Sequence, residues 1–258
     1  MTTVTETTPQ ARGLKASLKK IPFLVSIRQA LWKLYPRNVL KNQRKNFATL
    51  SKTYGQLASM KKWNCEDGSG NPIPWYTYPA IEYLSRFDFS GRKVFEYGSG
   101  NSSRWWAARC GSLVSIEDDR LWYDKIKRDA SDLTNFDYRF EEDKIKYVQQ
   151  EQLAGSDIVV IDGFHRAECT DYFLQQLKLG SIDPILLIFD NSDWFPKSIG
   201  RLNKELNWIQ VDFSGFGPIN PYTWTTTVFI NPLHQNKLTY LRELSPIAGL
   251  VQVDKLDY

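Results

Sequence analysis

A short glycine-rich turn between an apolar run and a helical pattern constrains this chain more than any other feature. Residues 94–97 are apolar except for Glu96, as in a buried strand, and residues 98–102 are small or polar. Gly98 and Gly100 lack a Cβ, so they can take positive φ and let the backbone approach a ligand. The amides of the next helix would then face that ligand. The pattern predicts a nucleotide-binding turn, although plain strand-to-helix connections share it.

A second acidic residue, Glu117, ends the next apolar run at 113–116. In a doubly wound sheet the second strand ends beside the first, so Glu117 can accept hydrogen bonds from ribose hydroxyls. The dinucleotide-binding pattern predicts the same contact, but it expects glycine or alanine where this chain has Ser103. The Glu96 carboxylate would also repel a pyrophosphate and suit a cationic ligand. An NAD-dependent oxidoreductase is therefore the less favoured alternative.

Glu96, the glycine turn and Glu117 together resemble the S-adenosylmethionine site of class I methyltransferases, over roughly residues 75–231. The resemblance implies that Glu96 lies near the methionine end of the cofactor and that Glu117 holds its ribose. It also implies that the turn passes under the cofactor, with Gly98, Ser99, Gly100, Asn101 and Ser102 as its binding residues. The implied cofactor carries a sulfonium and an ammonium and no phosphate, which agrees with the acidic residues.

The remaining apolar runs predict the rest of the sheet. Helical patterns alternate with most of the runs, which lie at 138–140, 158–161, 185–189, 208–211 and 225–230. Such alternation indicates a parallel sheet covered on both faces. The last two runs lack a helix between them, which predicts a hairpin-like pair. We expect an α/β, doubly wound, mostly parallel seven-stranded Rossmann-like sheet with an antiparallel last strand, spanning a methyltransferase domain at 63–258.

Acidic and amide side chains follow two neighbouring strands. Asp162 comes after the fourth strand, and Asp190 and Asn191 follow the fifth. Three oxygen ligands at adjacent strand ends suit Mg²⁺. The arrangement resembles metal-dependent catechol-type O-methyltransferases, which implies a metal at these residues and a base three positions beyond Asp162, where this chain has His165. Asp162 is alternatively a cofactor contact or a helix cap.

Three further residues are candidates for contacting the acceptor. Tyr76 and Tyr78 precede the first strand, where the resemblance implies a wall or lid, although aromatic packing under a loop explains them as well. Arg166 can bind an acidic group of the acceptor or form a surface ion pair. The prediction is an S-adenosylmethionine-dependent methyltransferase, O-directed, acting on a small-molecule or glycan hydroxyl through His165 and Asp162. A non-catalytic nucleotide-binding module of the same fold is the alternative from another class.

The net charge of +4 divides unevenly along the chain. Residues 1–62 hold 13 Lys and Arg against one acidic residue, a net charge of +12, whereas residues 63–258 hold 20 basic and 28 acidic residues, a net charge of −8. We expect a basic N-terminal extension with a disordered start and an amphipathic helix over 14–35, interrupted at Pro22. Three roles of this extension remain as alternatives: packing on the domain, binding an anionic membrane surface and binding nucleic acid.

Nucleic acid is the less favoured partner. Amino-methyltransferases of DNA and RNA carry an Asn/Asp-Pro-Pro-aromatic motif after the fourth strand, and residues 162–165 lack it.

The apolar run 21–27 is shorter than the roughly 20 residues that span a bilayer. Three widely spaced cysteines predict buried free thiols of a reducing compartment. We expect a cytoplasmic protein, with peripheral membrane association through the extension as one alternative.

Overall fold

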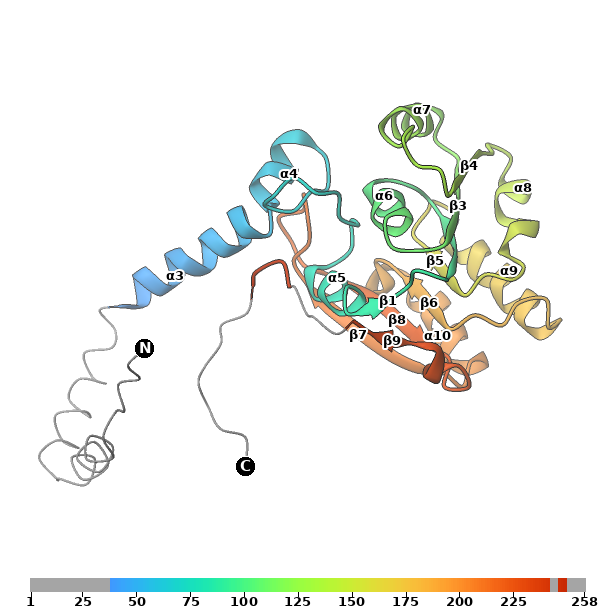
Figure 1. The fold of residues 1–258 in the computed structure, drawn as a ribbon. Coiled ribbons are helices and arrows are strands. Elements are labelled where there is room, and N and C mark those ends of the chain that lie inside the picture. The colour runs from blue at the N-terminus through green and yellow to red at the C-terminus, as the bar shows by residue number, and fades with distance from the viewer. Residues whose placement is uncertain (1–37, 242–245, 250–258) are drawn as a thin grey trace, which may run out of the picture. The chain divides into compact units, whose positions relative to one another are not determined.

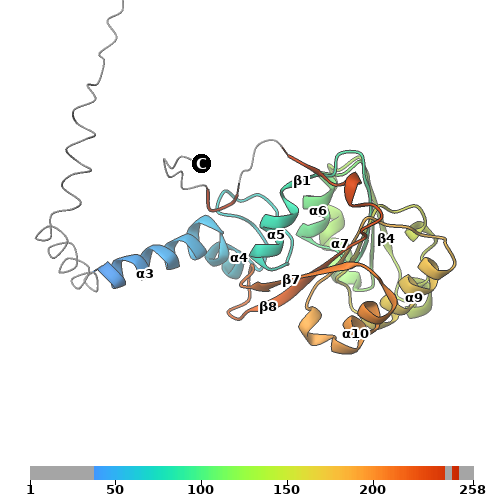
Figure 2. The ribbon, with the colours of Figure 1, turned by 90° about the horizontal axis from the view of Figure 1, so that it is seen from below.

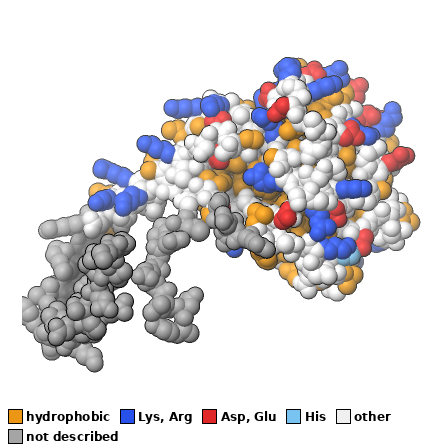
Figure 3. All heavy atoms as spheres, in the orientation of Figure 1, with side chains coloured by type: hydrophobic (Ala, Val, Ile, Leu, Met, Phe, Trp, Pro, Cys, Tyr) orange, Lys and Arg blue, Asp and Glu red, His pale blue; other side chains and the backbone are white. Residues whose placement is uncertain are grey.

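The structure is a computed structural model that describes residues 38–241 and 246–249. The expected disordered start and the helix over 14–35 lie outside these ranges. The chain divides into two compact units at Ala48. In the first unit the described part is helix α3 (Val39–Ala48), over which Lys and Arg side chains gather (Figure 3). Leu40 and Phe47 of this helix are exposed.

A seven-stranded sheet forms the centre of the second unit (Figure 1). The strands are β2 (Lys93–Tyr97), β3 (Ser112–Glu117), β4 (Phe136–Phe140), β5 (Ile158–Ile161), β6 (Leu186–Phe189), β7 (Ile209–Gly215) and β8 (Trp224–Ile230). Their order is β4-β3-β2-β5-β6-β8-β7, and β8 is antiparallel to both neighbours. The predicted fold class is therefore confirmed, including the antiparallel last strand and its pairing with the strand before it.

The register brings four strand ends together at one edge of the sheet. Tyr97 at the end of β2 pairs with Ile116 of β3 and Ile161 of β5, and Ile161 pairs with Phe189 of β6. The residues that follow these strands are thus neighbours in space although they are distant in sequence. In an open α/β sheet, this edge is where ligands bind.

Helices cover both faces of the sheet. They are α5 (Tyr78–Leu84), α6 (Asn101–Ala107), α7 (Arg120–Asp129), α8 (Lys144–Val148), α9 (Arg166–Lys178) and α10 (Pro196–Glu205). Because side chains alternate along a strand, Val94 packs in one core with Trp106 of α6, and Phe95 packs in another with Phe173 of α9. In Figure 2, β7 and β8 lie between α5 and α10, as a doubly wound sheet requires.

Short elements complete the second unit. They are the π-helical turn η2 (Thr49–Thr53), α4 (Gln56–Lys62), the 3₁₀ turns η3 (Glu151–Leu153), η4 (Ser192–Trp194) and η5 (Gln235–Lys237), and the paired strands β1 (Phe87–Asp88) and β9 (Thr239–Tyr240). The compact unit begins at Thr49, before the predicted start at residue 63. Gln56 of α4 donates a hydrogen bond to the Gly217 carbonyl oxygen at 3.0 Å, which ties α4 to the loop after β7.

Two sequence expectations concern the chain as a whole. All three cysteines are buried free thiols, as predicted. Within the described ranges, the helices are too short or too polar to traverse a lipid bilayer.

Candidate functional site

A cavity of about 680 Å³ runs along the edge where the strands end. Its wall includes all five predicted turn residues together with Glu117, Asp162, Arg166, Asp190 and Asn191. The sequence therefore identified much of this wall. It did not identify six aromatic residues that line the cavity as well: Trp63, Trp75, Trp122, Phe164, Trp194 and Tyr222.

Two glycines allow the turn after β2 to lie against the loop after β5. Gly98 has φ of 88°, as predicted, and a Cβ there would lie 2.8 Å from the Gly163 amide nitrogen. A Cβ on Gly163 would overlap the Tyr147 hydroxyl. Gly100 is different, because its φ of 166° is extended and a Cβ would meet only ordinary contacts. The prediction of positive φ is therefore correct for Gly98 and wrong for Gly100.

Glu96 supports the turn from below and does not line the cavity. Its Oε2 accepts hydrogen bonds from Ser103 Oγ at 2.6 Å and Ser115 Oγ at 2.7 Å, whereas Oε1 has no partner among the described residues. Burial raises the pKa of this carboxyl. Because side chains alternate along a strand, the Glu96 side chain points toward α6. It therefore does not lie in the cavity, where it was expected beside the cofactor. The Ser103 hydroxyl that departs from the dinucleotide pattern is thus a partner of Glu96.

Glu117 faces the cavity as expected. Its Oε2 accepts a hydrogen bond from Ser99 Oγ at 2.7 Å, and its Oε1 accepts from the amides of Asp118 and Asp119 at 3.1 Å each. Burial raises the pKa of Glu117 to about 7. Asp119 Oδ1 accepts from the Trp122 amide at 2.8 Å, so Asp119 caps the start of α7.

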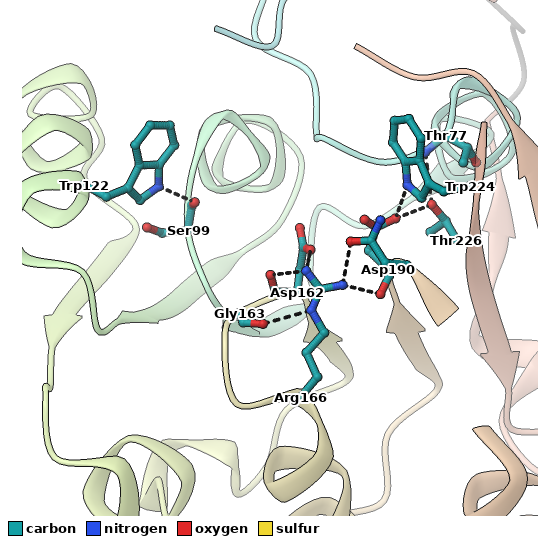
Figure 4. A network of polar contacts seen from close by, with 10 residues as sticks. Thr77, Ser99, Trp122, Asp162, Gly163, Arg166, Asp190, Trp224 and Thr226 are labelled. Carbon is teal, nitrogen blue, oxygen red and sulfur yellow. Dashed lines mark hydrogen bonds and ion pairs between the residues drawn. The ribbon is translucent and has the colours of Figure 1, made fainter. Parts of the chain in front are cut away.

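Trp122 belongs to the first turn of α7 and lines the cavity beside the glycine turn. Its Nε1 donates to the Ser99 carbonyl oxygen at 2.8 Å (Figure 4). This bond fixes the indole ring next to Gly100, whose Cβ would lie 3.7 Å from it. The sequence offered one signal for this contact: an aromatic residue, Trp122, in the helical pattern that follows Glu117.

Arg166 lies at the centre of the strand-end cluster (Figure 4). Nη2 donates to the Asp162 carbonyl oxygen at 2.9 Å and to Asp162 Oδ1 at 2.8 Å. Nη1 donates to Asn191 Oδ1 at 2.8 Å and to the Asp190 carbonyl oxygen, and Nε donates to the Gly163 carbonyl oxygen at 2.9 Å. A guanidinium has five N–H donors, and all five are used. No donor remains for the predicted acidic group of an acceptor.

The residues proposed to bind Mg²⁺ do not fit a metal in this arrangement. The Arg166 guanidinium takes Asp162 Oδ1 and Asn191 Oδ1 as acceptors, and these are two of the oxygens that the metal would need. A cation placed there would meet an existing positive charge. Among the described residues, no three His, Cys, Asp or Glu side chains are grouped so that they could hold a metal. We therefore assign no step to Mg²⁺.

Asp190 is held by the neighbouring strand. Its Oδ1 accepts hydrogen bonds from Trp224 Nε1 at 3.1 Å and from Thr226 Oγ1 of β8 (Figure 4). The Thr226 hydroxyl is oriented in turn, because it accepts from the Thr77 amide at 3.0 Å. Within the described ranges, Oδ2 of Asp190 accepts no side-chain hydrogen bond. Burial raises the pKa of Asp190 to about 6, although Arg166 opposes the shift.

Besides Glu96, three predicted residues lie outside the cavity wall. His165 has Nε2 3.5 Å from Asp118 Oδ2, and its ring contacts Tyr147. Tyr76 is fully buried and accepts a hydrogen bond from Trp106 Nε1 at 3.4 Å, and Tyr78 is buried in the same core. The tyrosines therefore pack under a loop, and the geometry does not favour His165 as a base.

The cavity combines negative charge with backbone strain. Among the described residues, five that line the cavity carry carboxyl groups, and Arg166 is the single basic one. In the described chain, the non-glycine residues with positive φ are Trp63, Asn191 and Ile219, and all three line this cavity. Such conformations cost about 1–3 kcal/mol each and concentrate at functional sites. The cavity therefore has the chemistry of a binding site for a cationic ligand.

Comparison with known proteins identified similar structures only. No protein-family model matches the chain, and no curated protein matches it either. The O-methyltransferase TomG from Streptomyces achromogenes, solved with S-adenosylmethionine, aligns at 18% identity with 60% of this chain and 77% of its own, at a TM-score of 0.44.

Two further structures align over similar lengths. The N-methyltransferase NodS from Bradyrhizobium japonicum, solved with S-adenosylhomocysteine, aligns at 15% identity with 70% of this chain and 99% of its own (TM-score 0.44). An rRNA methylase from Streptococcus thermophilus aligns at 11% identity with 59% and 96% (TM-score 0.40). At these identities the similarity is one of fold, and function has to be inferred from the cavity.

Proposed function

We propose that this chain, whose seven-stranded sheet with an antiparallel last strand is the one that the class I methyltransferase resemblance implies, is an S-adenosylmethionine-dependent methyltransferase acting on a hydroxyl group. The observation that carries the proposal is the cavity at the strand ends. It joins the glycine turn, the buried Glu117 carboxylate and four more carboxyl groups, and within the part of the chain that the structure describes Arg166 is the single basic residue of its wall. A sulfonium and an ammonium suit this charge, whereas the pyrophosphate of NAD would be repelled.

The wall offers a partner for each part of that cofactor. Glu117 can accept hydrogen bonds from the ribose hydroxyls, and the Trp122 ring provides an apolar surface for a purine. Arg166 takes Oδ1 of Asp162 and leaves Oδ2, beside the glycine turn, to accept a hydrogen bond from the ammonium group. The cavity volume of about 680 Å³ is within the usual range for ligand sites, roughly 300–1,000 Å³.

When bound, the cofactor supplies a methyl group that is already electrophilic and a thioether that leaves with the electron pair of the C–S bond. The chain's own residues then position the acceptor and remove one proton. Asp190 has the geometry for this role, since Thr226 and Trp224 hold Oδ1 and leave Oδ2 to take the hydroxyl proton as the oxygen forms its bond to carbon. Arg166 positions Asp162 and the backbone of Asp190.

Calorimetric titration with S-adenosylhomocysteine and with NADH tests the cofactor. We expect the first to bind and the second not to bind, and the reverse result would favour an oxidoreductase. An acceptor assay with Asp190→Asn tests the base: turnover should fall while S-adenosylhomocysteine affinity is preserved. In the wild type, kcat/KM should rise with pH through about 6 as Asp190 loses its proton. A chain that binds the cofactor and transfers no methyl group would be a non-catalytic module.

Peripheral membrane binding by residues 1–62 is a separate proposal. In the described part of this segment, α3 carries Lys41, Arg44 and Lys45 next to the exposed Leu40 and Phe47. Basic and apolar side chains on one short helix suit an anionic lipid surface. Deleting residues 1–48 should abolish sedimentation with phosphatidylserine vesicles at low salt, while neutral vesicles serve as the control. Unchanged binding of the truncated chain would contradict the proposal.

A further inference from the structure

Part of the cavity wall combines aromatic rings with side-chain amides. Three chain segments that line the cavity each supply one exposed aromatic ring and one asparagine. The pairs are Trp63 with Asn64, Trp194 with Asn191, and Tyr222 with Asn220. We call these six residues the aromatic rim.

The rings of the aromatic rim are available to a ligand. Trp63 is 60% exposed, Trp194 55% and Tyr222 45%. The Trp194 and Tyr222 rings have centroids 6.3 Å apart, so they form one continuous apolar surface. Exposed aromatic surface on a concave wall is unfavourable unless a ligand covers it.

The backbone of the rim is held in strained conformations. Trp63 has φ of 52° and Asn191 has φ of 51°, and Ile219 directly before Asn220 has φ of 63°. Each of the three rim segments thus contains, or directly adjoins, a non-glycine residue in the left-handed region. Strain at all three segments indicates that the positions of these side chains matter for function.

The amides of the rim distinguish between classes of ligand. Within the described ranges, the side-chain amides of Asn64 and Asn220 make no hydrogen bond, and both residues line the cavity. A purely apolar acceptor would bury them unpaired, at a cost of about 1–3 kcal/mol for each group. An amide has both donors and acceptors, so it matches the neighbouring hydroxyls of a sugar, whose C–H faces pack on aromatic rings.

Charge argues against an amine or a nucleic acid at the rim. The six residues of the aromatic rim are uncharged, so the rim itself offers no partner for the ammonium group of an amine. Asp162 is offset by Arg166, and the free oxygen of Asp190, Oδ2, is the one that takes the proton of the acceptor. Arg166 has no free donor for a phosphate. A neutral, hydroxyl-rich molecule fits these conditions best.

We propose that the aromatic rim is a carbohydrate subsite and that the methyl acceptor is a hydroxyl of a neutral sugar. This inference rests on the methyltransferase function proposed above. A sugar ring packed on Trp194 and Tyr222 lies next to Asp190, which follows β6 and lines the same cavity. The amides of Asn64 and Asn220 would then hold the hydroxyls that do not react.

The test uses the full-length protein saturated with S-adenosylhomocysteine. Neutral disaccharides (cellobiose, maltose, mannobiose and N,N′-diacetylchitobiose) are titrated at millimolar concentration and followed by saturation-transfer NMR, with catechol and phenethylamine as non-sugar probes. We expect sugar binding that weakens about tenfold in Trp194→Ala and in Tyr222→Ala, as for the loss of one packed ring. Trp194→Phe should restore part of the affinity, and S-adenosylhomocysteine binding should be unchanged in all variants.

Tyr240→Ala is the matched control, because Tyr240 is a 61% exposed aromatic residue outside the cavity wall. It should leave sugar binding unchanged. Absence of binding by all four sugars, preferential binding of catechol or phenethylamine, or sugar binding that survives both alanine variants would overturn the subsite. If the wild-type protein does not bind S-adenosylhomocysteine, the proposed function is refuted instead. Failure of the sugar subsite and failure of the proposed function are therefore distinguishable.

Discussion

Replacing Glu117 by Gln should stabilise the fold at alkaline pH and at the same time weaken cofactor binding. The substitution keeps the shape of the side chain and removes its charge. Glu117 is 6% exposed, and burial raises its pKa from 4.5 to about 7. A buried carboxylate with a raised pKa costs stability, whereas the same carboxylate is an effective acceptor for ribose hydroxyls.

The magnitude follows from the pKa. A shift from 4.5 to about 7, at about 1.4 kcal/mol per unit, corresponds to roughly 3 kcal/mol. The folded chain binds the proton more tightly than the unfolded chain, so this cost is absent below about pH 4.5 and complete above about pH 7. The Gln amide still accepts from Ser99, but as a neutral group, and this bond is weaker than the charge-assisted bond to Glu117 by about 1 kcal/mol. The net gain for Glu117→Gln at pH 8 is about 2 kcal/mol, or roughly 4–8 °C in Tm.

Binding should change in the opposite direction. A hydrogen bond from a hydroxyl to a charged acceptor contributes about 1.5–3 kcal/mol. Losing the charge at Glu117 should therefore reduce S-adenosylhomocysteine affinity about 10- to 100-fold. Wild-type affinity should also rise with pH through about 7, because the carboxylate is the stronger acceptor.

Thermal unfolding at pH 5 and pH 8, together with calorimetric titration, measures both effects. Asp119→Asn is the matched control, since Asp119 is an exposed carboxylate of the same wall and asparagine also caps helices. It should show no pH-dependent stabilisation. A Glu117→Gln variant that melts lower than wild type by the same amount at both pH values would refute the burial argument. Unchanged S-adenosylhomocysteine affinity would refute the ribose contact.

Other substitutions test the remaining geometry. Gly98→Ala should destabilise the fold by about 2 kcal/mol or more in urea unfolding, because of its positive φ and the 2.8 Å approach to Gly163, whereas Gly100→Ala should be nearly neutral. Tyr147→Phe should raise stability by up to about 1 kcal/mol in the same assay, since it removes a buried hydroxyl without a partner. Arg166→Ala should lower the free energy of unfolding by roughly 3–5 kcal/mol, because Asp162 loses its counter-charge. Adding Mg²⁺ should restore neither activity nor stability. Rescue by Mg²⁺ would support the predicted metal site.

Local sequence was sufficient for the fold and for the location of the site. Apolar runs separated by helical patterns predicted the sheet, because a parallel strand that is buried on both faces consists almost entirely of apolar residues. Asp162 and Asp190 were identified as cavity residues for a related reason: a residue that directly follows a buried strand must emerge at the edge of the sheet. Gly98 was identified because its turn requires a conformation that glycine adopts freely.

Tertiary structure decided which way the side chains point and which distant segments meet. Glu96 turns under the glycine loop toward Ser103 and Ser115, and His165 turns toward Asp118, although both stand at positions that the pattern marks as catalytic or binding. Arg166 occupies the place predicted for a metal, because the ends of β5 and β6 present their oxygens to the first residue of α9.

The aromatic rim also could not be predicted from local sequence, because its residues are far apart along the chain. Trp63, Trp194 and Tyr222 come from three segments separated along the chain and line one cavity only after the sheet has formed. Their orientation depends on left-handed backbone at Trp63, Asn191 and Ile219, a conformation that asparagine tolerates but that tryptophan and isoleucine rarely adopt. The sequence by itself determined the sheet and the edge at which the cavity lies. Packing between distant segments determined the charges and rings that a ligand meets there, because side-chain direction is set by neighbours that are remote in sequence.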